Sequence, residues 1–114
     1  MKPCTAFLAL ALLAAPAFPQ PADDAARLHA LFDREWEVRL KEDPLFATAV
    51  GRHEYNALLP SITLADLERR ARAAQATLGE LAAIDRAKLG AGDVVNYDMF
   101  RRQLENRIKD FELG

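Results

Sequence analysis

Six apolar side chains in the second half of the chain recur at alternating spacings of three and four residues. This spacing places side chains on one face of an α-helix, whereas a half-buried strand would need apolar residues at every second position. The two central members are alanines, whose small side chains let a neighbouring helix approach closely. The pattern predicts a long helix whose packing seam consists of Leu64, Leu67, Ala71, Ala74, Leu78 and Leu81.

Two other segments show the same helical periodicity. The first has Leu28, Leu31, Phe32, Trp36 and Leu40 on one face, and the last has Tyr97, Phe100, Leu104, Ile108 and Phe111. At this spacing the aromatic side chains are expected in the core. Short connections favour antiparallel neighbours. We therefore predict an all-α fold with three main antiparallel helices, in up-and-down order, plus a short helix.

Polar and special residues mark the expected ends of these helices. Asp23 or Asp24 can cap the first helix, Thr63 the second and Asp93 the third, because their side chains accept hydrogen bonds from free backbone N–H groups. Pro44 ends the first helix and opens the short one through Val50, and Gly51 is placed to terminate it in a left-handed conformation. Residues 52–62 lack periodicity and are expected to form an ordered loop.

The N-terminus has the three parts of a secretory signal peptide. Lys2 supplies a basic start, residues 6–18 are apolar, and Ala15-Pro16-Ala17 is a small-x-small cleavage pattern. The apolar run is shorter than the about 20 residues that span a bilayer, so an uncleaved anchor is the minor alternative. We predict a signal peptide over 1–17 with cleavage after Ala17, and a periplasmic or secreted bacterial protein without a membrane anchor after cleavage.

The mature chain would begin with a flexible lead-in over 18–26, because Pro19 and Pro21 disfavour helix, and continue with a helical segment over 27–114. The single cysteine excludes an internal disulfide, and it would leave with the signal peptide. The 15 Lys and Arg residues are outnumbered by 17 Asp and Glu residues. Without a basic excess, nucleic acid is not an expected partner.

Catalytic motifs are incomplete throughout the chain. His53-Glu54 begins like the zinc motif HExxH, but Ala57 stands where the second histidine is needed. A three-dimensional metal site from His29, His53 and Glu54 is a minor alternative to surface or loop-stabilising roles for these residues. Ser61 has no nucleophile-elbow setting. From the motifs we predict no catalytic, cofactor-binding or metal-ligating residue in this chain.

Several sequence segments together resemble the N-terminal portion of proteins in a bacterial family, domain of unknown function 885. These segments are Leu28–Trp36, Asp43–Gly51, Arg52–Pro60 and Asn96-Tyr97-Asp98, and the resemblance covers about residues 27–114. It implies a larger, mostly helical fold and a likeness to secreted zinc-dependent peptidases whose HExxH motif lies far toward the C-terminus. Zinc is accordingly expected only for a full-length relative.

The same resemblance singles out an ordered loop. Its matching positions are Gly51, His53, Tyr55 and Pro60, while Asn56 stands where an acid is common in the family. Two interpretations remain open. Either Tyr55 and Pro60 fix a turn, which we favour, or the loop lines a substrate cleft.

Two functions follow as hypotheses. In the first, the chain is an N-terminal, non-catalytic helical fragment of a secreted peptidase-like protein, and its partner is the remainder of a longer polypeptide. In the second, it is a self-standing periplasmic helical module that binds a protein partner or self-associates through the Leu64–Leu81 seam.

Overall fold

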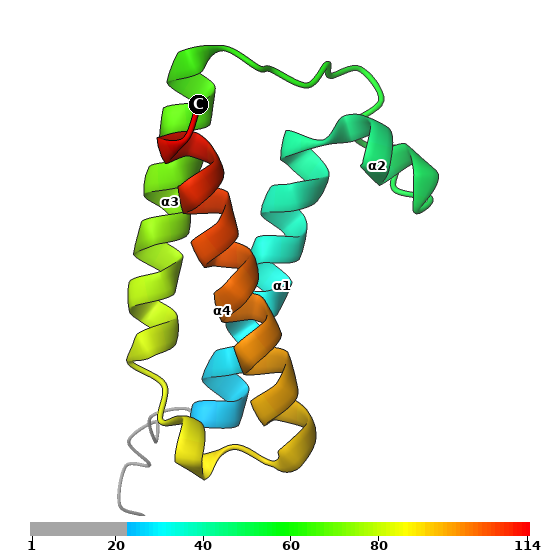
Figure 1. The fold of residues 1–114 in the computed structure, drawn as a ribbon. Coiled ribbons are helices and arrows are strands. Elements are labelled where there is room, and N and C mark those ends of the chain that lie inside the picture. The colour runs from blue at the N-terminus through cyan, green and yellow to red at the C-terminus, as the bar shows by residue number, and fades with distance from the viewer. Residues whose placement is uncertain (1–22) are drawn as a thin grey trace, which may run out of the picture.

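The computed structural model describes residues 23–114, so the predicted signal peptide and its Ala17 cleavage site lie outside the described residues. The described chain consists of α1 (Asp24–Glu42), α2 (Pro44–Ala49), α3 (Leu64–Ala82), a short 3₁₀-helix η1 (Arg86–Lys88) and α4 (Ala91–Glu112). The three long helices alternate in direction (Figure 1). The predicted all-α fold is confirmed. None of these helices is long and apolar enough to cross a membrane.

The predicted caps at the first two long helices are confirmed. Asp23 accepts a hydrogen bond of 2.7 Å from the backbone N–H of Ala26, and Thr63 accepts one of 3.2 Å from that of Asp66. Because the Asp23 cap fixes the start of α1 at Asp24, residues 24–26 are helical. The predicted lead-in over 18–26 therefore extends three residues too far.

The third cap was predicted wrongly. Gly90 occupies the N-cap position of α4 without a side-chain hydrogen bond, and Asp93 lies inside the first turn. The carboxylate of Asp93 instead contacts His29 on α1, as described below. Upstream, Asp85 caps η1, because its side chain accepts a hydrogen bond from the backbone N–H of Ala87. The apolar periodicity did not predict this short 3₁₀-helix.

The hydrophobic core lies where α1 and α4 begin and α3 ends. Leu28, Leu81 and Leu104 are fully buried there, one from each long helix. Around them cluster Leu31, Ala74, Ile84, Tyr97 and Phe100. The Leu/Ala seam thus packs inside the chain over its C-terminal part, and the core joins the three helices at one end.

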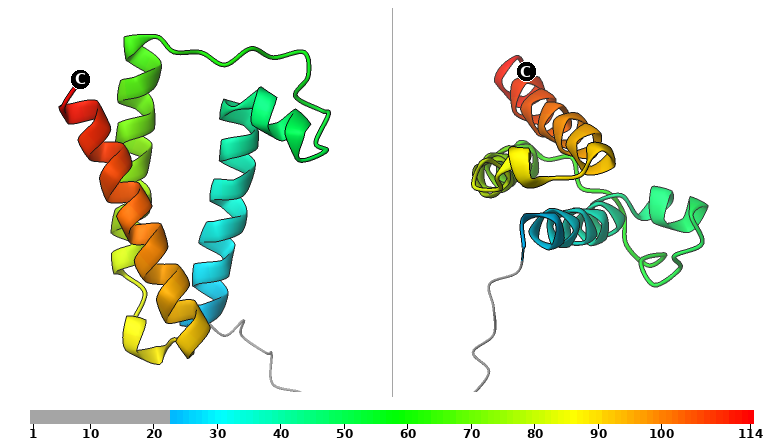
Figure 2. Two further views of the ribbon diagram at one scale, coloured as in Figure 1. Left: turned by 45° about the vertical axis from the view of Figure 1, so that its right-hand side comes forward. Right: turned by 90° about the horizontal axis from the view of Figure 1, so that it is seen from below.

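The opposite end of the bundle is markedly more apolar at its surface. We call it the open end; it comprises the second half of α1, α2, the loop over 50–63, the start of α3 and the end of α4 (Figure 2). Of the twelve large hydrophobic side chains that are exposed among residues 23–114, ten lie here. They are Trp36, Val38, Leu45, Val50, Leu58, Leu59, Ile62, Leu64, Leu67 and Leu113.

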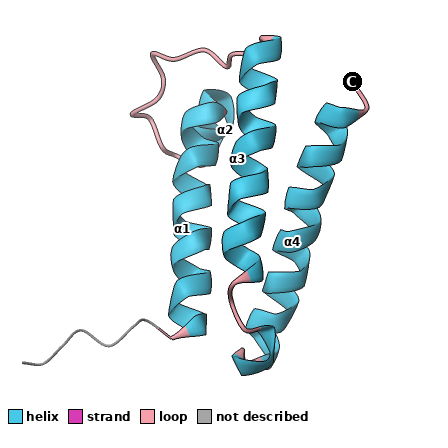
Figure 3. Cartoon of the chain, turned by 90° about the vertical axis from the view of Figure 1, so that its left-hand side faces the viewer, coloured by secondary structure: helices cyan, strands magenta, loops and turns pink. Residues whose placement is uncertain are grey.

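Core positions predicted from periodicity are only partly confirmed at this end, where Leu40 and Ala71 are buried but others are not. Trp36 is 42% exposed, and the seam residues Leu64 and Leu67 are 74% and 42% exposed. The helices here diverge, as the separation of α4 from α3 toward its C-terminus shows (Figure 3). Helical periodicity identifies a face suited to burial, but it does not supply the neighbour that buries it.

Candidate functional site

The loop predicted to be ordered is held in its first half by polar contacts. Gly51 adopts a φ of +84°, the left-handed conformation predicted for it. Arg52 then donates hydrogen bonds of 2.9 and 3.0 Å to Glu37 on α1 and of 2.6 Å to Glu54. These bonds from Arg52 lower the pKa of the Glu37 and Glu54 carboxyl groups. The loop is thereby fastened to α1.

The other predicted loop positions do not converge on one site. His53 is exposed, Tyr55 is half-buried, and Pro60 is exposed in the extended segment that leads to α3. The backbone carbonyl of Tyr55 accepts a hydrogen bond of 2.9 Å from Leu58, which closes a turn. Asn56 accepts a hydrogen bond of 2.7 Å from the Thr48 hydroxyl. These contacts favour a turn-forming role for the loop.

The two histidines lie in separate environments. His29 on α1 contacts Asp93 on α4, with 2.8 Å between Nε2 and Oδ1, whereas Glu54 beside His53 binds Arg52. This carboxylate partner of His29 was not predictable from local spacing, because 64 residues separate the pair. Among residues 23–114, no three His, Cys, Asp or Glu side chains are grouped to hold a metal ion. The donor set described here does not fit a zinc site, which needs three or four such ligands.

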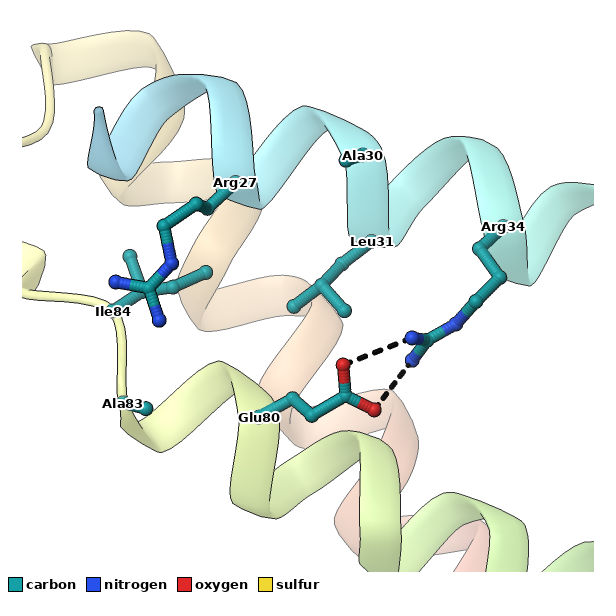
Figure 4. Close-up of a pocket in the computed structure, with 7 residues that line it drawn as sticks. All are labelled: Arg27, Ala30, Leu31, Arg34, Glu80, Ala83 and Ile84. Atoms are coloured by element: carbon teal, nitrogen blue, oxygen red, sulfur yellow. Dashed lines mark hydrogen bonds and ion pairs between the residues drawn. The ribbon is translucent and has the colours of Figure 1, made fainter. Parts of the chain in front are cut away.

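A cavity of about 430 Å³ lies between α1 and the end of α3 (Figure 4). Its floor is apolar, with Leu31 and Ile84 nearly fully buried. On its wall, Arg34 donates two hydrogen bonds of 2.9 Å to Glu80, and this pairing lowers the pKa of the Glu80 carboxyl. Because each charge meets an opposite charge, the cavity offers neither an activated nucleophile nor an uncompensated charge for substrate binding.

A second ionic cluster ties the end of α1 to the start of α3. Glu42 accepts hydrogen bonds of 2.7 and 3.1 Å from Arg69 and one of 2.6 Å from Arg70. These bonds lower the pKa of the Glu42 carboxyl. Arg70 also donates a hydrogen bond of 2.7 Å to the backbone carbonyl of Ser61. The cluster therefore joins α3 both to the end of α1 and to the last part of the segment that connects α2 to α3.

Residues 44–114 match the family model described as "Bacterial protein of unknown function (DUF885)". The chain belongs to the DUF885 family. The matched part comprises α2, η1 and the long helices α3 and α4. No curated protein and no solved structure matches the chain.

The DUF885 match starts directly after α1, yet α1 is part of the same fold. It supplies Leu28 and Leu31 to the core, and its Glu35 accepts hydrogen bonds from Thr77 on α3 and from Arg107 on α4. A DUF885 segment without α1 would expose the apolar faces that these residues cover. The first long helix is therefore a structural partner of the matched segment.

Within the DUF885 segment, the diverging ends of α3 and α4 enclose a groove of about 460 Å³ at the open end. Apolar and charged side chains line it together. The apolar lining comes from Leu64, Leu67, Ala71 and Phe111, and the charged lining from Arg70, Arg107 and Asp110. The arrangement suits the binding of another polypeptide surface, because an apolar floor and a polar rim are typical of protein interfaces.

Proposed function

We propose that this DUF885 chain is the N-terminal, non-catalytic helical part of a secreted protein similar to zinc-dependent peptidases. Its role is to pack against the remainder of a longer polypeptide. The packing surface is formed by α2 and the loop that follows it, at the open end. The observation that carries the proposal is the exposure of large apolar side chains there.

Leu59, Ile62 and Leu45 are 87%, 80% and 69% exposed. Each would gain about 25 cal/mol for every Å² of apolar surface removed from water. Exposed apolar residues that cluster on one side of a small protein mark interaction sites, whereas scattered ones carry no such meaning. The clustering around α2 and the loop supports a packing role for this side of the molecule.

The polar groups support the same interpretation. Glu37, Glu42 and Glu80 each bind arginine side chains, and their lowered pKa values keep them ionised at neutral pH. A general acid or base works best with a pKa near the operating pH. Their ion pairs with arginines join structural elements, and we expect the zinc chemistry that the family resemblance implies in residues outside this segment.

The coding DNA beyond the Gly114 codon provides the first test. A continuation that encodes HExxH, in frame or frame-shifted, supports the proposal, and an ordinary stop codon followed by unrelated sequence contradicts it. N-terminal sequencing of the exported protein tests the secretory part of the proposal. A mature chain that starts at Phe18 is the expected result, and an uncleaved chain contradicts it.

The packing surface can be tested on the chain itself by replacing Leu59 and Ile62 with serine. Because both side chains are exposed, the double variant should melt within about 2 °C of the original protein and bind less of a dye that reports exposed apolar surface. A matched replacement of the exposed Met99, which lies away from the open end, should leave dye binding nearly unchanged. A lowered melting temperature in the double variant would show that these side chains stabilise the chain's own fold.

A further inference from the structure

The groove between α3 and α4 is separate from the α2 and loop surface. Its apolar floor continues the Leu/Ala seam beyond the point where that seam is buried. Ala74 and Leu81 are covered by the chain itself, whereas Leu67 is 42% exposed and Phe111 on the facing helix is partly exposed. Leu64 and Leu67, the first two seam residues, therefore stay largely exposed within residues 23–114, whereas Ala71 behind them is buried.

The opposite charges that line the groove indicate which kind of surface it can bind. Arg107 and Asp110 are exposed residues three positions apart on α4, and both line the groove. Arg107 makes one contact of 3.4 Å with Glu35, and Asp110 has no ion-pair partner among the described residues. If two α4 helices cross antiparallel between these positions, Arg107 of each copy lies opposite Asp110 of the other. The groove is thus complementary in charge to itself.

We propose that the groove binds a second copy of this chain in a twofold-symmetric dimer. The two α4 helices cross antiparallel, Arg107 pairs with Asp110 of the second copy at two equivalent places, and Phe111 of each copy covers the half-exposed Leu67 of the other. A twofold interface requires such self-complementarity, because each surface patch meets an identical patch. The apolar contacts supply the affinity, and the ion pairs fix the register.

Sedimentation velocity of the exported chain over about 1 to 100 µM tests the dimer. The original protein should sediment as a reversible dimer. Arg107→Asp and Asp110→Arg should each weaken dimerisation by about tenfold or more, because each places like charges opposite each other. An equimolar mixture of the two variants should dimerise again, because the mixed pair restores both opposite-charge contacts. Contacts within one chain cannot produce this recovery.

Glu105→Arg is the matched control, since it reverses an exposed charge on α4 outside the groove; it should leave dimerisation unchanged. Thermal melting establishes that each variant is folded. If Arg107→Asp unfolds through loss of the Glu35 contact, Asp110→Arg alone tests the dimer, because Asp110 makes no ion pair among residues 23–114. A monomeric original protein, or a dimer that persists in Asp110→Arg, would overturn the proposal. Neither result affects the packing surface at α2, which uses other residues.

Discussion

The Nε2 atom of His29 lies 2.8 Å from Oδ1 of Asp93, and this contact joins α1 to the first turn of α4. The hydrogen bond and the negative charge of Asp93 raise the pKa of His29, with smaller contributions from Asp33 and Asp23. The contact lies beside the core, at the end of the molecule where the three long helices meet. It therefore makes the association of α1 with α4 depend on pH.

The sign of this dependence follows from linkage. Because the folded state raises the pKa of His29, the contact contributes its full stabilisation below the unfolded pKa of about 6.5 and loses it as pH rises through the folded value. His29→Gln should therefore lower the melting temperature more at pH 5.5 than at pH 8.5. His53→Gln is the control, since its exposed imidazole makes no hydrogen bond within the described residues, and an equal effect at both pH values in His29→Gln would contradict the prediction.

A matched pair of leucines on α3 tests the position of the core. Leu81 is fully buried and Leu64 is 74% exposed. Leu81→Ala should lower the free energy of unfolding by about 2–5 kcal/mol, because it removes buried methyl groups and leaves a cavity. Leu64→Ala should change it by less than about 0.5 kcal/mol. Denaturant unfolding measures the free energy of unfolding of both variants. Similar decreases in the two variants would contradict the position of the core described above.

Alanine substitutions at two glycines should change the stability of the protein in opposite directions. Gly51 has a φ of +84°, so Gly51→Ala forces a side chain into a left-handed conformation and should cost about 1–2 kcal/mol. Gly79 lies inside α3, and a Cβ atom there would meet nothing within 4 Å. Gly79→Ala should therefore stabilise the protein by about 0.5–1 kcal/mol through helix propensity. The melting temperature should fall in Gly51→Ala and rise in Gly79→Ala. A higher melting temperature in Gly51→Ala is incompatible with the left-handed turn at this position.

The Glu42 cluster should matter more than an ordinary surface ion pair. Glu42→Gln removes a carboxylate that binds both Arg69 and Arg70 and should cost about 1–2 kcal/mol. Because its folded pKa is lowered, the stabilisation is present above about pH 4.5 and lost as pH falls through the folded value. Glu68→Gln, which breaks an exposed pair with Arg72 one turn away, should cost under about 0.5 kcal/mol. Equal losses in the two variants would show that the cluster contributes no more than a surface pair.

The helices were predictable because their causes are local. The apolar periodicity, the Asp23 and Thr63 caps and the left-handed Gly51 each depend on neighbours within a few residues, and each is confirmed. The exposure of Trp36 was not predictable in this way. Its ring packs edge-on against Phe46 at 5.6 Å between centroids, but the side chain stays 42% exposed, because burial depends on how distant helices are placed.

The polar contacts were the least predictable part of the candidate sites. Glu37 and Arg52 are 15 positions apart, and Glu42 and Arg69 are 27 positions apart, so their pairing depends on how the helices are placed in space. The Glu68–Arg72 pair, by contrast, is local, because its members lie one helical turn apart on α3. Of the predicted loop positions, Gly51 lies in the turn that ends α2 and Tyr55 opens a separate turn to Leu58, while Pro60 lies in the extended segment beyond them.

The most direct measurement for the non-catalytic role is a peptide-hydrolysis assay of the purified chain with added zinc, in parallel with a zinc chelator. Because the donor groups of residues 23–114 do not form a zinc site, we expect no hydrolysis above the buffer rate and no effect of the chelator. Chelator-sensitive hydrolysis that His53→Ala abolishes would contradict the proposed role and place a catalytic centre within this chain.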